Sequence, residues 1–449
     1  MRIPAAESNG SQVKKSNART QRIRDTLRAL GHRNYRIYFF GMLISFTGTW
    51  MQSVAQGWLI YRLTGSAWLL GLAGFASQVP VFLLAPLGGV MADRHSRHRI
   101  IIATQTIAML QAFTLAAMTL TGVITVNAIF GLAILLGVVN AFDLPTRQAF
   151  MVELVSKQDL MNAIALNSSM VQASRVLGPA VAGLLVGWLG EGPCFLINGI
   201  SYLAVLASLF AIRVSSAPIS KPEVNAFSLL REGFAYVRHS RPVRALLLLV
   251  AFVSIFGLPY SVLMPIFASE ILHGGPRILG VLLGASGIGA LMGALTLAAR
   301  RNVHGLGRLV ALSVAIFAVV LIFFALSRNV VISAILLVPA GFCLLLQMSA
   351  SNTLMQTMVP DRMRGRLMSF YAMSLMGMAP FGSLLSGAVA VRLGAPVTVA
   401  LGGGLCLGAS LLFWLRLPSL RPDAVSMLVA SEAIPGEPTE VVAPSDVKG

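Results

Sequence analysis

Long apolar stretches alternate with short polar segments along most of the chain. Each apolar stretch holds about 17 to 28 residues, and a helix needs roughly 20 residues to cross the hydrocarbon core of a bilayer. The pattern therefore predicts an all-α membrane protein with twelve transmembrane helices. We expect these helices at residues 37–63, 68–92, 100–122, 126–142, 162–189, 194–212, 245–272, 278–299, 309–326, 330–350, 367–391 and 395–415.

The polar segments divide the chain into five parts. These are a basic N-terminal segment (1–35), a first six-helix half (36–212), a linker (213–244), a second six-helix half (245–416) and a C-terminal tail (417–449). Within the linker, residues 227–238 have the spacing of a short amphipathic surface helix. The tail is rich in Pro, Glu, Ser and Val, so we expect it to be disordered. The N-terminal segment lacks the apolar core of a cleaved signal peptide.

Composition supports a polytopic membrane protein. Of 449 residues, 56% are hydrophobic and only 11% are charged, and the mean hydropathy is +0.79. The net charge of +18 does not indicate nucleic acid, because the basic residues recur between apolar spans and form no single basic domain. The three cysteines, Cys194, Cys343 and Cys406, lie in or beside apolar spans, which excludes a disulfide framework and predicts no metal centre.

The distribution of basic residues predicts the orientation. Four of the 34 Lys and Arg residues fall in the predicted outer segments and one, Arg175, falls inside a span, which leaves 29 on the inner side. Positive residues accumulate on the cytoplasmic side of membrane proteins. We therefore expect a multi-pass membrane protein with both termini in the cytoplasm.

An internal repeat relates the two predicted halves. Val155, Gly178, Gly183, Leu189 and Gly190 match Val359, Gly382, Gly387, Leu393 and Gly394 at a constant separation of 204 residues. A second group, beginning with Leu70 and Gly71, matches Leu279 and Gly280 at a separation of 209 residues. Such repeats are typical of transporters whose halves move about a central site.

A polar island at residues 88–99 separates the second and third spans. It holds two glycines, one carboxylate and three arginines in the spacing Gly-x-x-x-Asp-Arg-x-x-Arg-x-Arg. This spacing resembles the loop signature of the major facilitator superfamily, which implies an inner gate that meets the opposite half near the start of span eleven. The expected gate residues are Gly89, Asp93, Arg94, Arg97, Arg99, Asp143 and Arg147.

Three further segments sharpen the resemblance. They are Gly48-Thr49-Trp50-Met51-Gln52-Ser53-Val54-Ala55-Gln56-Gly57-Trp58, Phe142-Asp143-Leu144-Pro145-Thr146-Arg147-Gln148-Ala149-Phe150 and Asn162-Ala163-Ile164-Ala165-Leu166-Asn167-Ser168. Over about residues 25–415 the chain resembles the branch of bacterial exporters that includes the enterobactin exporter. The resemblance implies secondary active export of a siderophore or an amphipathic drug-like molecule, commonly in exchange for protons and with no bound cofactor. The alternatives are an importer or uniporter of a small metabolite, or a lipid transporter.

Polar residues inside the spans are candidates for a substrate cavity. Ser45, Thr49, Gln52 and Gln56 recur at steps of four, three and four, which places them on one helical face. Such a face should meet the bundle interior or a watery cavity, because lipid offers amides no partners. Cavity lining and hydrogen bonding between helices both fit this stripe. The full cavity set is Thr49, Gln52, Gln56, Gln172, Arg175, Tyr260, Gln347, Asn352 and Tyr371.

Arg175 is the principal charged candidate, since it lies well inside span five, which we expect at residues 162–189. A charge at that depth is costly and is usually kept for function or compensated by a partner. It favours anionic or oxygen-rich substrates; alternatively, it braces the helix near Pro179. We expect a bend that seals one end of the cavity at Gly178, Pro179 and Gly183, with Gly382 and Gly387 as counterparts.

Proton coupling lacks an evident site, because all sixteen Asp and Glu residues fall in predicted loops, tails or span ends. Asp143 and Glu270 are the nearest carboxylates; we expect them to pair with a basic loop, although either would titrate if partly buried. The six histidines lie in polar connections and tails and form no catalytic arrangement, so we expect no enzyme. The expected partners are a small-molecule substrate and the lipid bilayer, with no nucleic acid, and we expect a monomer.

Overall fold

The computed structural model describes residues 28–156, 158–212, 226–298 and 305–432, and all regular elements within them are helical. The first group comprises η1 (Arg28–Gly31), α2 (Arg33–Thr64), α3 (Ala67–Arg94), α4 (Arg97–Leu120), α5 (Val126–Leu154), α6 (Leu160–Leu189) and α7 (Glu191–Ala211). α8 (Ala226–His239) precedes the second group. That group comprises α9 (Arg241–Phe256), η2 (Leu258–Ser261), α10 (Met264–Ile266), η3 (Phe267–Ile271), α11 (Pro276–Ala298), α12 (Leu306–Leu326), α13 (Val330–Met358), α14 (Asp361–Ala372), η4 (Met373–Gly377), α15 (Ala379–Leu393) and α16 (Ala395–Glu432).

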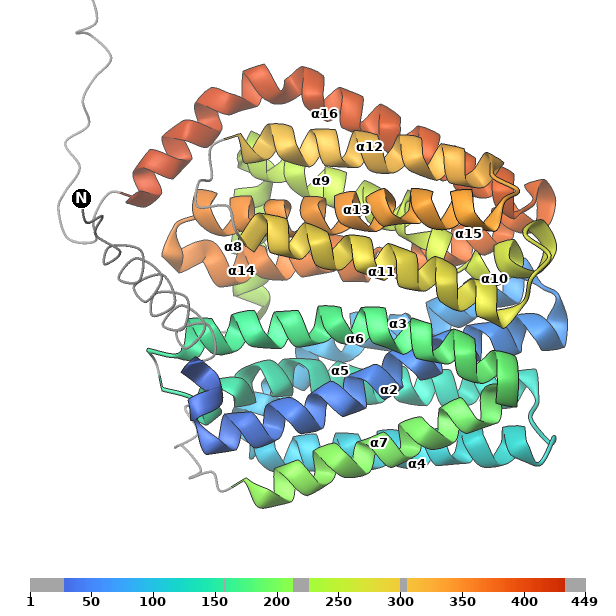
Figure 1. Ribbon diagram of the computed structural model, residues 1–449. Coiled ribbons are helices and arrows are strands. Elements are labelled where there is room, and N and C mark those ends of the chain that lie inside the picture. Colours follow the sequence, from blue (N-terminus) through green and yellow to red (C-terminus); the bar gives the residue numbers. More distant parts are fainter. Residues whose placement is uncertain (1–27, 157, 213–225, 299–304, 433–449) are drawn as a thin grey trace, which may run out of the picture.

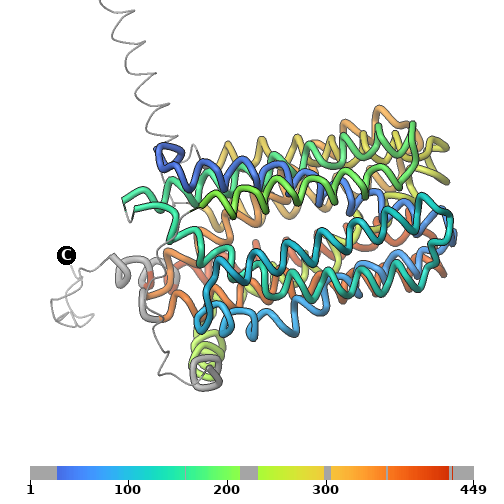
Figure 2. Tube along the Cα trace, turned by 90° about the horizontal axis from the view of Figure 1, so that it is seen from below, coloured from blue at the N-terminus to red at the C-terminus, as the bar shows by residue number. Residues whose placement is uncertain are grey.

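Some expectations lie outside the described residues. They concern residues 1–27 of the basic N-terminal segment, residues 213–225 of the linker and residues 433–449 of the tail. The predicted surface helix of the linker is confirmed, because α8 spans it. It lies across the bundle axis in both Figure 1 and Figure 2.

Eleven helical segments of the described chain are long and apolar enough to cross a membrane. α2 is not among them, although it holds 32 residues. Its polar stripe, which includes Gln52 and Gln56, lowers its mean hydropathy. The prediction of an all-α membrane protein is therefore confirmed, whereas the count of twelve spans stays a prediction.

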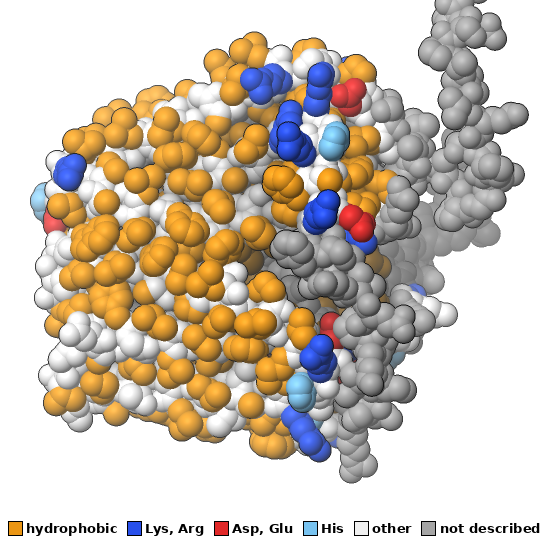
Figure 3. All heavy atoms as spheres, turned by 180° about the vertical axis from the view of Figure 1, so that it is seen from behind, with side chains coloured by type: hydrophobic (Ala, Val, Ile, Leu, Met, Phe, Trp, Pro, Cys, Tyr) orange, Lys and Arg blue, Asp and Glu red, His pale blue; other side chains and the backbone are white. Residues whose placement is uncertain are grey.

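The helices α2–α7 form one half of the molecule and α9–α16 form the other, one below the other in Figure 1. α2 begins and α16 ends at the same end of the bundle. Figure 3 shows most of the visible Lys and Arg side chains in a band at this end, with apolar side chains over the rest of that face. We call it the basic end, which includes the turns at His95 and Pro360. The far end includes the turns at Gly65, Gly190 and Gly394.

The largest departures from the predicted boundaries are at the ends of α5 and α16. α5 continues to Leu154, well beyond its expected end at Phe142, because Asp143 and its polar neighbours are buried and satisfied inside the bundle. α16 continues to Glu432, so the start of the tail is helical. Leu420 belongs to the core and Met427 packs against it, and these contacts stabilise the extension.

The internal repeat is visible in the packing of α5 and α13, which hold 29 residues each and begin at repeat-related positions. A Cβ atom at Gly137 would lie 2.5 Å from the carbonyl oxygen of Ser77. A Cβ atom at Gly341 would lie 1.9 Å from the carbonyl oxygen of Ser286. The two glycines are related by the first offset of the sequence repeat, and the two serines by the second. The two halves therefore use the same glycine for the same close helix approach.

Repeat-related glycines also join the two halves. A Cβ atom at Gly183 of α6 would lie 2.5 Å from Cα of Gly280 in α11. One at Gly71 of α3 would lie 2.8 Å from Cα of Gly387 in α15. All four residues are near the far end of their helices, so the halves meet there backbone to backbone.

Candidate functional site

Side chains from both halves pair at the far end. The Tyr61 hydroxyl of α2 donates a hydrogen bond to the Glu270 carboxylate of η3. The Arg277 guanidinium of α11 lies 5.6 Å from the ring centroid of Trp188 in α6. Together with the glycine contacts, these pairs hold the far end of the molecule closed.

Three of the predicted gate residues at the basic end, Asp93, Arg94 and Arg99, are open to solvent. The side chain of Asp93 is 53% exposed, and its carboxylate lies 3.8 Å from the Arg97 guanidinium on the same segment. Arg97 also pairs with Glu153 of α5 at 2.9 Å. Arg94 and Arg99 are exposed. The main contacts of α3 with the other half are to α15 and η4, whereas α14 packs against α8, α13 and η4.

The two glycines before this loop differ in their surroundings. A Cβ atom at Gly88 would lie 2.2 Å from the carbonyl oxygen of Ala141, whereas one at Gly89 would have nothing within 4 Å. The close helix approach therefore depends on Gly88. The gate role expected of Gly89 stays a prediction.

Asp143 and Arg147 form a buried ion pair on α5. The carboxylate Oδ2 lies 2.6 Å from Arg147 Nε, and the side chains are 2% and 12% exposed. The Nε–H is not aligned for a hydrogen bond, so the contact is ionic. The other carboxylate oxygen accepts hydrogen bonds from Thr104 at 2.7 Å and from Gln105 at 3.1 Å, both on α4. The expected pairing of Asp143 with a basic loop is wrong, because these partners satisfy the carboxylate inside the bundle.

The polar stripe of α2 faces its own half. Gln52 donates to the side-chain oxygen of Gln111 in α4 at 3.1 Å and accepts from Asn198 in α7 at 2.8 Å. Thr49 lies 3.3 Å from the hydroxyl of Tyr202 in α7. In this conformation α4 and α7 supply the partners of Thr49 and Gln52, which favours hydrogen bonding between helices, and their cavity role stays a prediction. Gln56, further along the stripe, is half-buried.

Arg175 lies where the two halves approach each other. Its guanidinium is 5.5 Å from the ring centroid of Trp50 in α2, and it interacts electrostatically with Tyr260 of η2 in the other half. The Tyr260 hydroxyl is 2.8 Å from the Ser286 hydroxyl of α11. The carbonyl oxygen of Arg175 lies 3.4 Å from a Cβ position at Gly287. A half-buried cation, two aromatic rings and a hydroxyl thus meet within one region.

Gln172 lies one turn before Arg175 on α6. Its side-chain oxygen is buried and has no hydrogen-bond partner among the described residues. The side-chain oxygen of Gln347 in α13 is likewise buried and has no hydrogen-bond partner among the described residues. Its amide nitrogen donates to the Ser351 hydroxyl at 3.3 Å. Such oxygens accept a donor at little cost, because their desolvation has already occurred.

The remaining candidates of the second half differ in accessibility. Gln356 donates to Asn352 one turn away on α13 at 2.7 Å, and this pair lies toward the basic end. Tyr371 is buried, and its hydroxyl donates to the carbonyl oxygen of Met348 at 2.6 Å. The hydroxyl of Tyr371 thus tethers α14 to α13, and its cavity role stays a prediction.

The predicted bend residues serve helix contacts. α6 is continuous from Leu160 to Leu189 through Pro179. A Cβ atom at Gly178 would lie 2.4 Å from Trp50 Cβ, and one at Gly382 would lie 2.5 Å from the carbonyl oxygen of Ile255. Each of these two contacts stays inside its own half, whereas Gly183 and Gly387 contact the opposite half. In span eleven the irregular turn is η4, one turn before Gly382.

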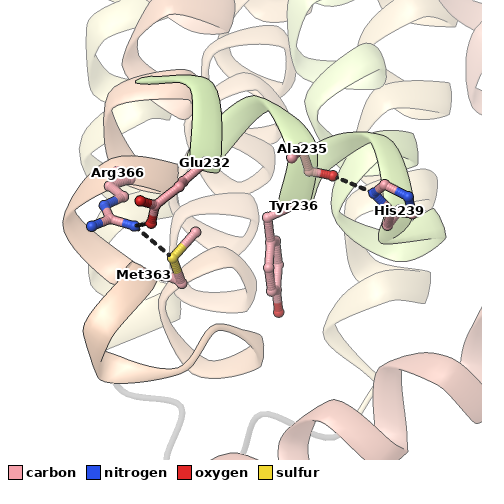
Figure 4. Close-up of a pocket in the computed structure, with 6 residues that line it drawn as sticks. All are labelled: Glu232, Ala235, Tyr236, His239, Met363 and Arg366. Carbon is pink, nitrogen blue, oxygen red and sulfur yellow. Dashed lines mark hydrogen bonds and ion pairs between the residues drawn. The ribbon is translucent and has the colours of Figure 1, made fainter. Parts of the chain in front are cut away.

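A pocket of about 540 Å³ lies between α8 and α14 at the basic end. Figure 4 shows Glu232 of α8 facing Arg366 of α14, with which it forms an ion pair, and Met363 beside them. Tyr236 and His239 line the α8 side. The pocket is therefore at the edge of the second half, away from Arg175. No cluster of three potential metal ligands occurs in the part of the chain that the structure describes.

Sequence reasoning missed several partners. Trp50 lies in one of the segments that carry the family resemblance, and its spacing from the polar stripe places it on a different face of α2. No sequence pattern pointed to Thr104 and Gln105 as partners of Asp143, because a hydrogen bond between two helices produces no periodicity in the sequence. Tyr61 was equally hidden, since its partner Glu270 lies in the other half of the chain.

Comparisons with known proteins agree with this architecture. The chain is 26% identical over 391 residues to the enterobactin exporter of Shigella boydii, covering 87% of this chain and 93% of the relative. It is 25% identical over 353 residues to the staphyloferrin A transporter of Staphylococcus aureus, covering 78% and 88%. It is 24% identical over 401 residues to macrolide efflux protein A of Streptococcus pyogenes, covering 84% and 95%.

Solved structures match the fold at low sequence identity. The nucleoside transporter NupG superposes with a TM-score of 0.67 at 14% identity, covering 86% of this chain and 99% of that one. A bacterial homologue of the human lysosomal transporter Spinster, in an inward-facing conformation, gives 0.61 at 15% identity, covering 90% and 99%. The family model for transmembrane secretion effectors matches residues 25–443. The chain is therefore a transporter of the major facilitator superfamily and belongs to its transmembrane secretion effector family.

Proposed function

We propose that this transporter exports a small organic molecule across the cytoplasmic membrane by alternating access. The observation that carries the proposal is the contrast between the two ends. At the far end, Gly183 meets Gly280 and Tyr61 binds Glu270. At the basic end, Asp93 is exposed. This contrast supports a state that is closed at the far end and open at the basic end.

The orientation follows from the charges. Arg94, Arg97 and Arg99 lie at the basic end, and that end carries most of the basic residues. Because positive charge accumulates in the cytoplasm, the basic end is cytoplasmic and both termini are inside. The state described above is then one that loads substrate from the cytoplasm.

The substrate class follows from Arg175 and its aromatic neighbours. The half-buried Arg175 guanidinium beside Trp50 attracts anionic or oxygen-rich molecules, and the Trp50 ring stacks on aromatic ones. Relatives named for enterobactin, staphyloferrin A and macrolides support a siderophore or an amphipathic compound as cargo. Exchange for protons supplies the driving force.

Transport in proteoliposomes tests this proposal. We expect outward movement of enterobactin, staphyloferrin A or a radiolabelled macrolide to accelerate when the far side of the membrane is acidic. Inward accumulation of these probes would instead identify an importer. Movement of a fluorescent phospholipid, with none of the three probes transported, would identify a lipid transporter.

Asp93→Asn tests the gate. Without the carboxylate, contacts that close the basic end weaken, so we expect lower transport from a normally expressed and folded protein. The exposed neighbour His95 provides the control, His95→Gln. Unchanged transport by Asp93→Asn, with unchanged accessibility of cysteine probes at the basic end, contradicts the gate role.

A further inference from the structure

Asp143 is a carboxylate inside a membrane helix. It lies 17 residues after Val126, where α5 begins at the far end, which is about 26 Å along the axis at 1.5 Å per residue and within the roughly 30 Å of the hydrocarbon core. Its partners are the Arg147 cation and two neutral donors from α4, Thr104 and Gln105. Carboxylates at such positions are costly and commonly mark proton or ion pathways.

Helices α2, α5 and α7 supply the charged and aromatic groups around this carboxylate. α5 itself contributes Arg147, and α2 contributes Tyr38 and Phe46, whose ring lies 4.6 Å from the guanidinium. α7 contributes Tyr202, which interacts electrostatically with both charges. Arg147 is thus the one cation that these contacts place beside Asp143. A proton and Arg147 therefore compete for the same carboxylate.

The second half carries a neutral copy of this pair. The repeat offset that relates α5 to α13 maps Asp143 onto Gln347 and Arg147 onto Ser351. Gln347 and Ser351 are also buried and contact each other one turn apart, at 3.3 Å. The helix packing therefore tolerates an uncharged pair at this position, so the fold alone does not explain the charges of Asp143 and Arg147.

A hydrogen-bond acceptor for a protonated Asp143 is already present beside it. The side-chain oxygen of Gln105 is buried and has no hydrogen-bond partner among the described residues, although its amide nitrogen binds the carboxylate. A protonated Asp143 has a hydroxyl to donate, and when the Gln105 amide turns over, its buried unsatisfied oxygen gains from accepting this hydrogen bond. The site therefore has partners for both protonation states.

We propose that Asp143 is the proton-binding residue that couples transport to the proton gradient, with Arg147 as the residue that expels the proton. This inference rests on the proposed function and names its coupling site. When the far end is open, one proton from outside binds a carboxylate oxygen of Asp143, and the hydroxyl formed donates to Gln105. When the basic end opens, Arg147 returns to the carboxylate and the same proton leaves to the cytoplasm.

The test measures conformation and needs no substrate. Spin labels at Gln158→Cys and Arg308→Cys, both exposed and on different halves, report the opening of the basic end. The three native cysteines are buried, so labelling is selective. Because the ion pair is intact in the state open at the basic end, acidification should deplete that state. We expect the ratio of the two states to change about 5- to 150-fold, the usual range for linked sites.

Two variants at the site should remove this response. Asp143→Asn mimics the protonated residue, and Asp143→Gln/Arg147→Ser copies the pair of α13, which avoids leaving Arg147 buried and unpaired. Both should populate the two states in a ratio that varies less than about twofold with pH. The control His98→Gln removes a histidine of α4 that contacts Phe150 and the carbonyl oxygen of Leu209; it should respond like the parent protein.

A normal pH response in the folded double variant overturns the assignment, as does loss of the response in His98→Gln alone. Failure of the proposed function has a different signature. A parent protein that exchanges no radiolabelled macrolide, enterobactin or staphyloferrin A contradicts export while leaving the pH response intact. If both proposals hold, the double variant still exchanges the probe across the membrane but no longer accumulates it when a pH gradient is imposed.

Discussion

Gly183 of α6 and Gly280 of α11 meet so closely that a Cβ atom on Gly183 would lie 2.5 Å from the Cα atom of Gly280. No side chain separates the two helices at this point. The repeat-related pair, Gly71 and Gly387, makes the equivalent contact between α3 and α15. Closure of the far end thus depends on the absence of side chains at four positions.

Gly280→Val should therefore keep the far end from closing. The added side chain overlaps the backbone of α6, so we expect transport to fall sharply and cysteine probes near Gly65 to become accessible. Gly284→Ala is the matched control on the same helix, since its nearest neighbour, Ala180 Cβ, is 3.9 Å away. Equal transport by the two variants would refute a special role for the Gly183–Gly280 contact.

Arg175→Gln should weaken substrate binding more than folding. Loss of a charge-assisted contact at a partly buried site typically costs about 1.5–3 kcal/mol, or roughly 10- to 150-fold in affinity. Binding of an anionic siderophore and the melting temperature are measured on the same preparation. Arg62→Gln is the control, because Arg62 pairs with Glu191 at the far end inside the first half and leaves the contacts between the halves in place. Unchanged affinity with a lower melting temperature would assign Arg175 to bracing α6.

Gln52→Leu should lower stability without changing substrate affinity. Its amide links α2 to Gln111 and Asn198, and hydrogen bonds between membrane helices contribute about 0.6–2 kcal/mol. The free energy of unfolding in mixed micelles measures this effect. A selective loss of binding, with unchanged unfolding, would assign Gln52 to the substrate cavity.

The lowered pKa of Asp159 predicts that the free energy of unfolding depends on pH in the acid range. The hydrogen bond from His32, opposed by desolvation, and then those from Arg28 and Ser156 hold the pKa of Asp159 below its ordinary value of 3.8. A lowered pKa in the folded state stabilises the fold above the ordinary value, and this contribution is lost as pH falls through the lowered pKa. Asp159→Asn should therefore lower the melting temperature at neutral pH and leave it closer to the parent value in acid. Parallel melting curves at all pH values would contradict this.

Hydrophobic periodicity predicted most of the helices but not which neighbour each face meets. The stripe containing Thr49 and Gln52 was correctly placed on one face of α2, yet it faces α4 and α7. Periodicity reports that a polar face needs partners, and hydrogen bonds to distant helices are as good as a cavity. Asp143 was misplaced for a related reason, because a polar segment was interpreted as the end of a span although tertiary contacts satisfy it.

The glycine contacts between the halves lie in a different part of the molecule from the side chains that we propose to bind substrate. The halves meet through main-chain atoms at the far end, while the cation and ring that we propose to meet a substrate belong to side chains deeper in the molecule. Substitutions at Arg175 or Trp50 therefore leave the glycine contacts that close the far end in place. A scaffold of this kind changes its cargo by a few substitutions and keeps its transport cycle.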